Sequence, residues 1–222
     1  QNMYRLRLRQ LTIAAREILR AEGSAAAIAE ERRHAISQLC ALDRHHLRQI
    51  NKIYERFAEF FNTDRSGILA EHIAAIKQDL DGADTVLITG GNVVVLMNRL
   101  QLFGLGQALA RMNIVGWSAG AMVLCDRIVL FHDRMPQGRR DPEVLCNGLG
   151  LVPGTVLLPN AKNRLRTRET VRSSLFSRRF APATCLTLDN ESVLLMEDHK
   201  VRDSESVRHI ARDGKFERVK LA

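Results

Sequence analysis

The sequence predicts an α/β fold, in which helices cover both faces of a mainly parallel sheet to make a three-layer sandwich. From about residue 66 onward, short apolar runs typical of buried strands alternate with helical stretches, which is the pattern of this architecture. Two of these runs end in turns of small residues, at Gly90-Gly91-Asn92 and at Gly116-Trp117-Ser118-Ala119-Gly120-Ala121. No Val/Ile-rich run precedes Thr85, so the beginning of the chain is expected to be helical.

The difference between the helical beginning and the later alternation of strands and helices divides the chain into a helical segment over residues 1–65 and an α/β domain over residues 66–222. Apolar residues recur at helical spacing from Tyr4 to Leu19, which predicts an amphipathic helix. Core packing is the preferred explanation of this apolar stripe. A surface for self-association is the alternative.

A second helix is predicted from Ala25 to about Phe61, with a break near Leu42-Asp43. Gly23-Ser24 separates it from the first helix, and Ser24 is the expected N-cap. A third helix over 68–80 leads into the strand that begins near Thr85.

After Ser118 the apolar and polar pattern continues to alternate between strands and helices. The expected strands cover 127–131, 156–158, 184–188, 192–196, 207–216 and 216–221, the expected helices cover 119–125 and 167–176, and 138–146 is expected to be a charged loop. The strands over 192–196 and 207–216 are expected to form a terminal antiparallel addition.

The turn around Ser118 has the composition of a nucleophile elbow. In such a turn a serine sits in a strained backbone conformation that only small neighbours tolerate, and its Oγ is exposed at the end of a strand. The backbone N–H groups that follow can face a developing oxyanion. A tight turn without chemistry is the alternative explanation of this pattern taken alone.

The earlier turn, Gly90-Gly91-Asn92, supports the first explanation. Two glycines let the backbone approach a ligand closely and leave N–H groups free to point at it. Asn92 has a second interpretation, as the N-cap of the helix that follows.

Together, the two turns resemble those of the aspartyl dipeptidase (peptidase E) and cyanophycinase family. The resemblance continues through 132–136, 148–154 and 188–194 and covers roughly residues 66–222. It implies a class I glutamine amidotransferase-like fold and the activity of a serine peptidase. It also implies that Ser118 is the nucleophile and that Asp133, fifteen residues later, is the acidic member of the triad.

The resemblance further assigns the oxyanion hole to the N–H groups of Gly91 and Ala119, with Gly90 and Asn92 at the same pocket. It places the catalytic histidine after a proline at the end of the next strand, where this sequence has Asn160 after Pro159. A serine hydroxyl needs a base to take its proton, and an amide does not titrate near neutral pH. Loss of a triad member leaves a residual rate of roughly 10³ to 10⁴ over water, so we expect impaired or absent activity.

Two alternatives remain open at this point. The protein is an active hydrolase of small acidic or aspartyl peptides that uses another base, or a noncatalytic protein that binds or assembles through a basic rim. Of the seven histidines only His132 lies in a segment expected near Ser118, and strand alternation turns it away if Asp133 points inward. His45 and His46 are expected to be solvated.

The formal net charge of +8 is concentrated in one part of the chain. Residues 134–180 hold ten Arg or Lys against three Asp or Glu, and the expected rim of the site contains Lys162, Arg164 and Arg166. A solvated helix face is the preferred explanation, and a rim that attracts small acidic peptides or another anionic ligand comes next. Nucleic-acid binding is not expected, because aromatic residues are only 5% of the chain and give few stacking platforms.

The remaining features predict a cytoplasmic protein with no metal and no cofactor. Four scattered cysteines fit a reducing compartment as small buried residues, and no apolar run is long enough for a membrane span. The family's first parallel strands either lie upstream of Gln1 or are replaced by helices. A sheet without them exposes an edge, which favours a homo-oligomer.

Overall fold

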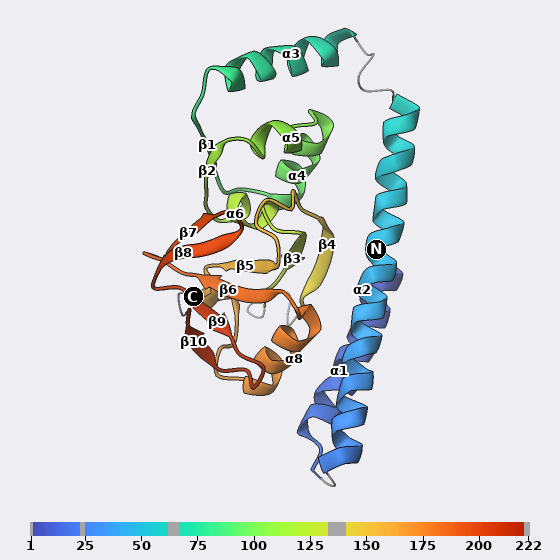
Figure 1. Ribbon diagram of the computed structural model, residues 1–222. Helices are drawn as coiled ribbons and strands as arrows, with labels where there is room; N and C mark the ends of the chain where they lie inside the picture. Colours follow the sequence, from blue (N-terminus) through green and yellow to red (C-terminus); the bar gives the residue numbers. More distant parts are fainter. Residues whose placement is uncertain (1, 23–24, 62–66, 133–140, 220–222) are drawn as a thin grey trace.

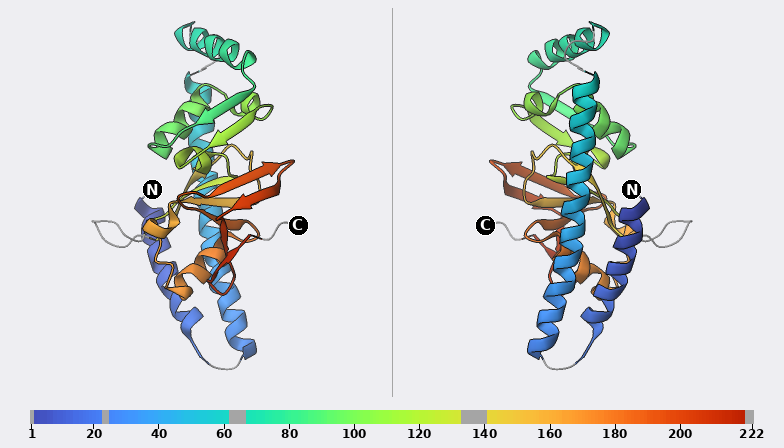
Figure 2. Two further views of the ribbon diagram at one scale, coloured as in Figure 1. Left: turned by 90° about the vertical axis from the view of Figure 1, so that its left-hand side faces the viewer. Right: turned by 90° about the vertical axis from the view of Figure 1, so that its right-hand side faces the viewer.

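A hairpin of two helices runs along one side of a mixed α/β body in the computed structural model, which describes residues 2–22, 25–61, 67–132 and 141–219 (Figures 1 and 2). Helix α1 (Asn2–Arg20) and helix α2 (Ala25–Phe61) pack through the apolar stripes that the sequence predicted. Leu8 and Ala15 of α1 and Leu39 of α2 are all buried in one cluster, which Leu175 of the α/β body joins. The expected N-cap, Ser24, lies outside the described residues.

The predicted break in the second helix is wrong, because α2 is continuous through Leu42 and Asp43. Leu42 packs in the cluster between the helices, and Asp43 is 2% exposed. Burial of both side chains against neighbouring elements holds the helix together where the sequence alone favours an interruption.

The next part of the chain carries the two turns of small residues. It comprises α3 (Gly67–Asp81), β1 (Thr85–Ile88), α4 (Val93–Leu102), α5 (Gly106–Leu109), β2 (Asn113–Gly116) and α6 (Ala119–Val123). Strands β1 and β2 are parallel neighbours, with Leu87 opposite Val115. Both turns therefore follow the carboxyl ends of adjacent parallel strands and lie at the same edge of this sheet. Helix α3 buries none of its side chains and lies at one end of the molecule (Figure 1).

The expected loop over 138–146 is partly wrong. Strand β3 (Arg127–Leu130) pairs antiparallel with β4 (Glu143–Asn147), which begins inside that range. Val144 and Cys146 of β4 are buried in the main core, and this burial outweighs the polar character of the flanking residues. Residues 138–140 lie outside the described part of the chain.

The last part of the chain forms a four-stranded sheet and a separate two-stranded hairpin. It contains β5 (Thr155–Pro159), α7 (Ala161–Arg164), α8 (Thr170–Phe180), β6 (Thr184–Leu188), β7 (Val193–Glu197), β8 (Lys200–Glu205), β9 (Arg208–Ile210) and β10 (Phe216–Arg218). Strands β5 and β6 are parallel, whereas β9 and β10 join β6 antiparallel, and β7 and β8 form an antiparallel hairpin. An antiparallel addition is present at the end of the chain as predicted, but the expected strand over 207–216 is wrong, because this segment is split into β9 and β10 by a turn, and β7 pairs with the unexpected strand β8.

The main core lies between these sheets and helices. Its largest side chains include Phe131, Phe180, Ile128 and Leu158, each no more than 1% exposed. Three of the cysteines are buried and all four are free thiols. Burial raises the pKa of Cys125 to about 11, so this thiol stays neutral and behaves as a small apolar group. None of the described helices has both the length and the apolar character that a membrane span needs.

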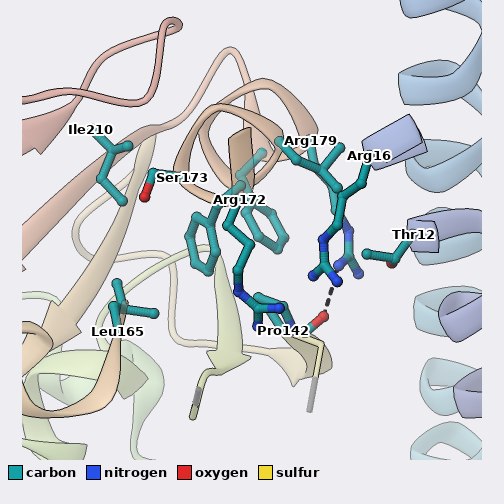
Figure 3. Close-up of a pocket in the computed structure, with 11 residues that line it drawn as sticks. Thr12, Arg16, Pro142, Leu165, Arg172, Ser173, Arg179 and Ile210 are labelled. Carbon is teal, nitrogen blue, oxygen red and sulfur yellow. Dashed lines mark hydrogen bonds between the residues drawn. The ribbon is translucent and has the colours of Figure 1, made fainter. Parts of the chain in front are cut away.

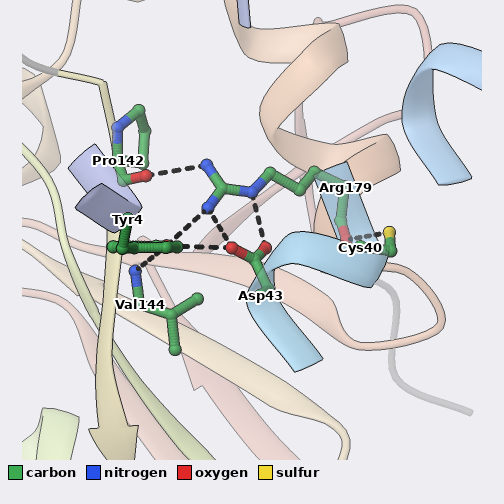
Figure 4. Close-up of polar contacts among 6 residues, drawn as sticks. All are labelled: Tyr4, Cys40, Asp43, Pro142, Val144 and Arg179. Atoms are coloured by element: carbon green, nitrogen blue, oxygen red, sulfur yellow. Dashed lines mark hydrogen bonds and ion pairs between the residues drawn. The ribbon is translucent and has the colours of Figure 1, made fainter. Parts of the chain in front are cut away.

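A buried polar network joins the helical hairpin to the α/β body (Figure 4). The Arg179 guanidinium of α8 donates to both carboxylate oxygens of Asp43 in α2, at 2.6 and 2.7 Å. The Tyr4 hydroxyl of α1 donates to Asp43 Oδ1 at 2.9 Å, and accepts from Arg179 Nη2 at 3.1 Å and from the Val144 N–H at 3.0 Å. Arg179 Nη1 also donates to the Pro142 carbonyl. We call this network of Tyr4, Asp43 and Arg179 the clasp.

The clasp satisfies charged and polar groups that have almost no contact with water. The side chains of Arg179 and Asp43 are 3% and 2% exposed. Burial opposes the charge on Arg179, but the hydrogen bonds and charge of Asp43 outweigh it and raise its pKa. Burial also raises the pKa of Tyr4. The expectation that His46 is solvated is wrong, because its ring is 7% exposed and stacks on Tyr4 at 3.9 Å, whereas His45 is exposed.

We predict that Asp43→Ala lowers the free energy of unfolding by about 3–5 kcal/mol, because the Arg179 charge then stays buried without its partner. Urea denaturation followed by circular dichroism measures the change. Glu55→Ala removes an exposed carboxylate from the same helix and should change stability by no more than about 0.5 kcal/mol. Equal effects of the two substitutions would contradict the role given to the clasp.

Candidate active site

Ser118 occupies the sharp turn between β2 and α6. Its backbone has φ 55° and ψ −120°, a conformation that a residue with a side chain rarely adopts. Its carbonyl accepts from the Met122 N–H in the first turn of α6. The predicted strand–turn–helix is therefore present, with the serine at its most strained position. Such strain costs of order 1–3 kcal/mol and persists only where surrounding packing imposes it.

The glycines around Ser118 supply that packing. A Cβ on Gly120 would lie 1.9 Å from the Ile88 carbonyl oxygen, and a Cβ on Gly90 would lie 3.0 Å from Ser118 Cβ. The first distance is impossible for a real side chain. The end of β1 can therefore lie against α6 only because residue 120 has no side chain, and the same close approach brings Gly90 against Ser118.

The turn after β1 forms the opposite side of the site. Gly91 has φ +125°, which suits glycine alone. Asn92 caps α4, because its Oδ1 accepts from the N–H groups of Val94 at 3.0 Å and Val95 at 3.2 Å. Gly91 and Asn92 line the same cleft as Ser118 and Ala119. The two interpretations of Asn92 are compatible, since it is both a helix cap and part of the cleft wall.

The cleft has a volume of about 310 Å³, enough for a small organic ligand. It is lined by Arg5 of α1, by the two turns with the starts of α4 and α6, by 130–132, by Asp141 and Glu143, and by Arg164. Backbone amides, a hydroxyl, an imidazole and charges of both signs therefore meet in one cavity. Apolar side chains such as Phe131 and Met122 complete its walls.

Arg164 is the member of the predicted basic rim that lines the cleft. Its guanidinium lies 5.7 Å from the centroid of the Phe131 ring, and burial lowers its pKa. Among the described residues no carboxylate pairs with it. Lys162 is exposed, and its backbone N–H donates to Asp189. Arg166 pairs with Glu169 at 3.2 Å, outside the cleft.

Asn160, at the expected position of the base, immediately follows β5. Its backbone is left-handed, with φ 58° and ψ 42°, which asparagine tolerates better than most residues. Its Oδ1 accepts from the Asn163 side-chain amide at 2.7 Å, and its N–H donates to the Leu188 carbonyl at 2.7 Å. Asn160 is not among the described residues that line the cleft.

His132 lies in the cleft wall next to Phe131. Strand alternation was expected to point the His132 side chain away from the site if Asp133 pointed inward. Strand β3 ends at Leu130, however, so strand alternation does not govern residue 132. Asp133, the expected acidic member of the triad, lies outside the described residues.

No sequence pattern predicted the acidic residues of the cleft. Glu143 Oε2 accepts from Arg5 Nε at 2.7 Å, and Asp141 Oδ1 accepts from Arg16 Nη2 at 2.5 Å. Both arginines come from α1, more than a hundred residues earlier. Pairing at such separations leaves no local pattern, so only the folded chain reveals these contacts.

A smaller cavity of about 20 Å³ lies between α1 and α8, away from Ser118 (Figure 3). Arg16, Arg172 and Arg179 converge on it beside Thr12, and Arg179 donates to the Pro142 carbonyl. This volume admits about one water molecule, so the larger cleft is the candidate active site.

Comparison with known proteins gives one family. The family model described as Peptidase family S51 matches residues 43–204, which is most of the chain and includes both turns and the whole of β3 to β7. The search of the curated proteins gave no match. Helix α1 and the first part of α2 precede the matched segment.

The strained backbone at Ser118 predicts opposite results for two small replacements. Ser118→Gly should raise the free energy of unfolding by about 1 kcal/mol, because glycine accepts φ 55° without steric cost. Ser118→Ala keeps the Cβ and therefore keeps the strain, so it should leave stability close to that of the unchanged protein. Chemical denaturation of the three proteins tests this, and a glycine variant no more stable than the alanine variant would argue against stored strain.

Proposed function

This chain belongs to peptidase family S51, and we propose that it is a serine peptidase-like protein that binds small acidic peptides while its hydrolytic activity is impaired or absent. The proposal depends most on Asn160. At the position expected to hold the proton acceptor stands an amide whose oxygen already accepts from Asn163. The elbow and the Gly91 turn are nevertheless formed around one cleft.

Each residue of the proposed site has a defined role. Ser118 Oγ would attack a carbonyl carbon, and the N–H groups of Gly91 and Ala119 would stabilise the oxyanion that forms, with Gly90 and Asn92 shaping their turn. Asp133 would orient a base if one were present. Asn160 cannot take the proton from Ser118, so the hydroxyl stays a weak nucleophile.

The charge of the cleft supports an acidic ligand. Arg164 contributes a cation that no described carboxylate neutralises, in a cleft whose two acidic residues are each paired with an arginine. A carboxylate of the ligand would neutralise the charge of Arg164. Lys162 and Arg166 would contribute only to the longer-range field.

The remaining parts of the proposal concern the whole protein. We place residues 66–222 in a class I glutamine amidotransferase-like sandwich around a mainly parallel sheet, with residues 1–65 as a helical addition. The parallel pairs β1–β2 and β5–β6 support this arrangement. The four free thiols suit the cytoplasm.

An active hydrolase is the second candidate, favoured by the presence of His132 in the cleft that Ser118 lines. In this case the imidazole of His132 would take the proton that the resemblance assigns to a histidine at position 160. The two candidates differ in whether Ser118 is nucleophilic in the unchanged protein.

A fluorophosphonate probe, which labels activated serines, distinguishes the two candidates. Under the first, the unchanged protein labels slowly, and Asn160→His raises the rate of labelling by about a hundredfold or more, the scale of a positioned general base. Ser118→Ala in the same background should abolish labelling. Cleavage of an aspartyl dipeptide, measured by amine release, should follow the same order.

Fast labelling of the unchanged protein that is lost in His132→Gln would instead support the active hydrolase. Measurable labelling that proceeds equally fast in the unchanged protein and in Ser118→Ala would contradict both candidates, since each assigns any labelling to this hydroxyl. Asn163→Ala is a matched control for the environment of residue 160, because it removes the contact to Asn160 without adding a base.

We also propose that the protein is a homo-oligomer. The support is an exposed sheet face, on which Leu87, Val115 and Trp117 are 62%, 50% and 48% exposed, and a helix α3 that has no buried residue. Two paired strands are marginal by themselves, and a second copy that covers this face would bury its apolar side chains.

Light scattering should therefore give a mass of at least twice 25.0 kDa, and Val115→Glu should reduce it to that of the monomer. Glu55→Ala, at an exposed position of α2, should leave the mass unchanged. A monomer at high protein concentration would refute this part of the proposal.

A further inference from the structure

We propose that α1, which precedes the segment matched by the family, builds one wall of the cleft, and that its Arg5 binds a carboxylate of the ligand and sets the preference for acidic ligands. This inference rests on the proposed function and deepens it. It starts from the position of Arg5, which lines the cleft together with Ser118, Gly91 and Arg164. The family match begins only at residue 43, so this wall is an addition to the matched segment.

The clasp fixes Arg5 in place. Its neighbour Tyr4 is 7% exposed, and the Tyr4 hydroxyl accepts from the Val144 N–H at 3.0 Å. Val144 is in turn the neighbour of Glu143, the partner of Arg5. One buried hydrogen bond therefore holds the two backbones that carry the ion pair, and the guanidinium is presented to the cleft from a fixed helix rather than a mobile arm.

The geometry of the ion pair leaves Arg5 available to a ligand. Glu143 takes only the Nε–H, at 2.7 Å, and the structure gives the terminal nitrogens of Arg5 no other partner among the described residues. A guanidinium has five N–H donors, so four remain, and the pair on Nη1 and Nη2 matches the two oxygens of a carboxylate. The Arg5 side chain is 41% exposed, whereas that of Glu143 is 11% exposed.

The charges around the cleft agree with this role. Each of the two acidic residues forms an ion pair with an arginine of α1. Glu143 pairs with Arg5 at 2.7 Å, and Asp141 pairs with Arg16. Their negative charge is thereby compensated and does not repel an anion. Arg164, which has no carboxylate partner in the described part of the chain, supplies the positive charge that these two ion pairs leave uncompensated. The cleft accordingly fits a small ligand with carboxylate groups.

Isothermal titration tests Arg5 without requiring turnover. The probes are the dipeptide Asp-Leu, which carries two carboxylates, and Asn-Leu amide, which carries none. Arg5→Gln should weaken binding of Asp-Leu about tenfold and leave binding of Asn-Leu amide unchanged. Arg5→Lys, which keeps the charge but not the planar fork, should give an intermediate loss. Asp-Leu amide and Asn-Leu, with one carboxylate each, assign which carboxylate Arg5 binds.

Arg7→Gln is the matched control, because Arg7 is exposed on the same helix and its loss changes the net charge equally. Weaker Asp-Leu binding in Arg5→Gln but not in Arg7→Gln supports the inference. If the unchanged protein binds Asp-Leu and both variants bind it equally well, the role of Arg5 is overturned while the proposed function stands. If the unchanged protein does not bind Asp-Leu, both fail. If Arg5→Gln weakens binding of Asp-Leu and of Asn-Leu amide by the same factor, Arg5 has a purely structural role and the inference is overturned.

Discussion

The buried contact between Arg179 and Asp43 is the constraint on which the arrangement of this protein depends. It joins three segments that are distant in sequence: α1 through Tyr4, α2 through Asp43 and α8 through Arg179. Two opposite charges in an apolar interior are costly unless their hydrogen bonds are complete, and here the Tyr4 hydroxyl and the Pro142 carbonyl complete them. The same contacts reach β4 at Val144, so the position of the helices and the wall of the cleft are set together.

The cleft contains a turn whose geometry is fixed by backbone packing, together with polar side chains that would transfer protons in the proposed function. Ser118 and the Gly91 turn are fixed by backbone packing, since contacts such as that of Gly120 with Ile88 leave no room for a side chain. The groups that would move protons are held less uniformly. Asn160 is hydrogen-bonded to Asn163, and His132 lies in the cleft wall just beyond the end of β3. In the proposed function, ligand binding and proton transfer therefore depend on different parts of this site.

Sequence reasoning succeeded where the signal is local. Helical periodicity predicted α1 and α3, and an apolar run followed by small residues predicted the turn at Ser118, because strand ends and tight turns depend on a few adjacent residues. It failed where distant partners decide the outcome. The unbroken α2, the strand β4 and the buried His46 all depend on packing against other elements. Arg5 and Glu143 meet across 138 residues, and no spacing rule links them. The role of Asn160 stays a prediction that rests on the resemblance.

The left-handed turn at Ser118 has a consequence for recognising enzymes by their signatures. The Ile88 carbonyl excludes any side chain at residue 120, and a side chain at residue 90 would crowd Ser118, so folding by itself favours this pattern of small residues. A chain can therefore keep both turns whether or not a base stands near the serine. The serine motif alone therefore indicates family membership and backbone shape. Catalytic activity has to be judged from the base that would accept the proton of the serine hydroxyl.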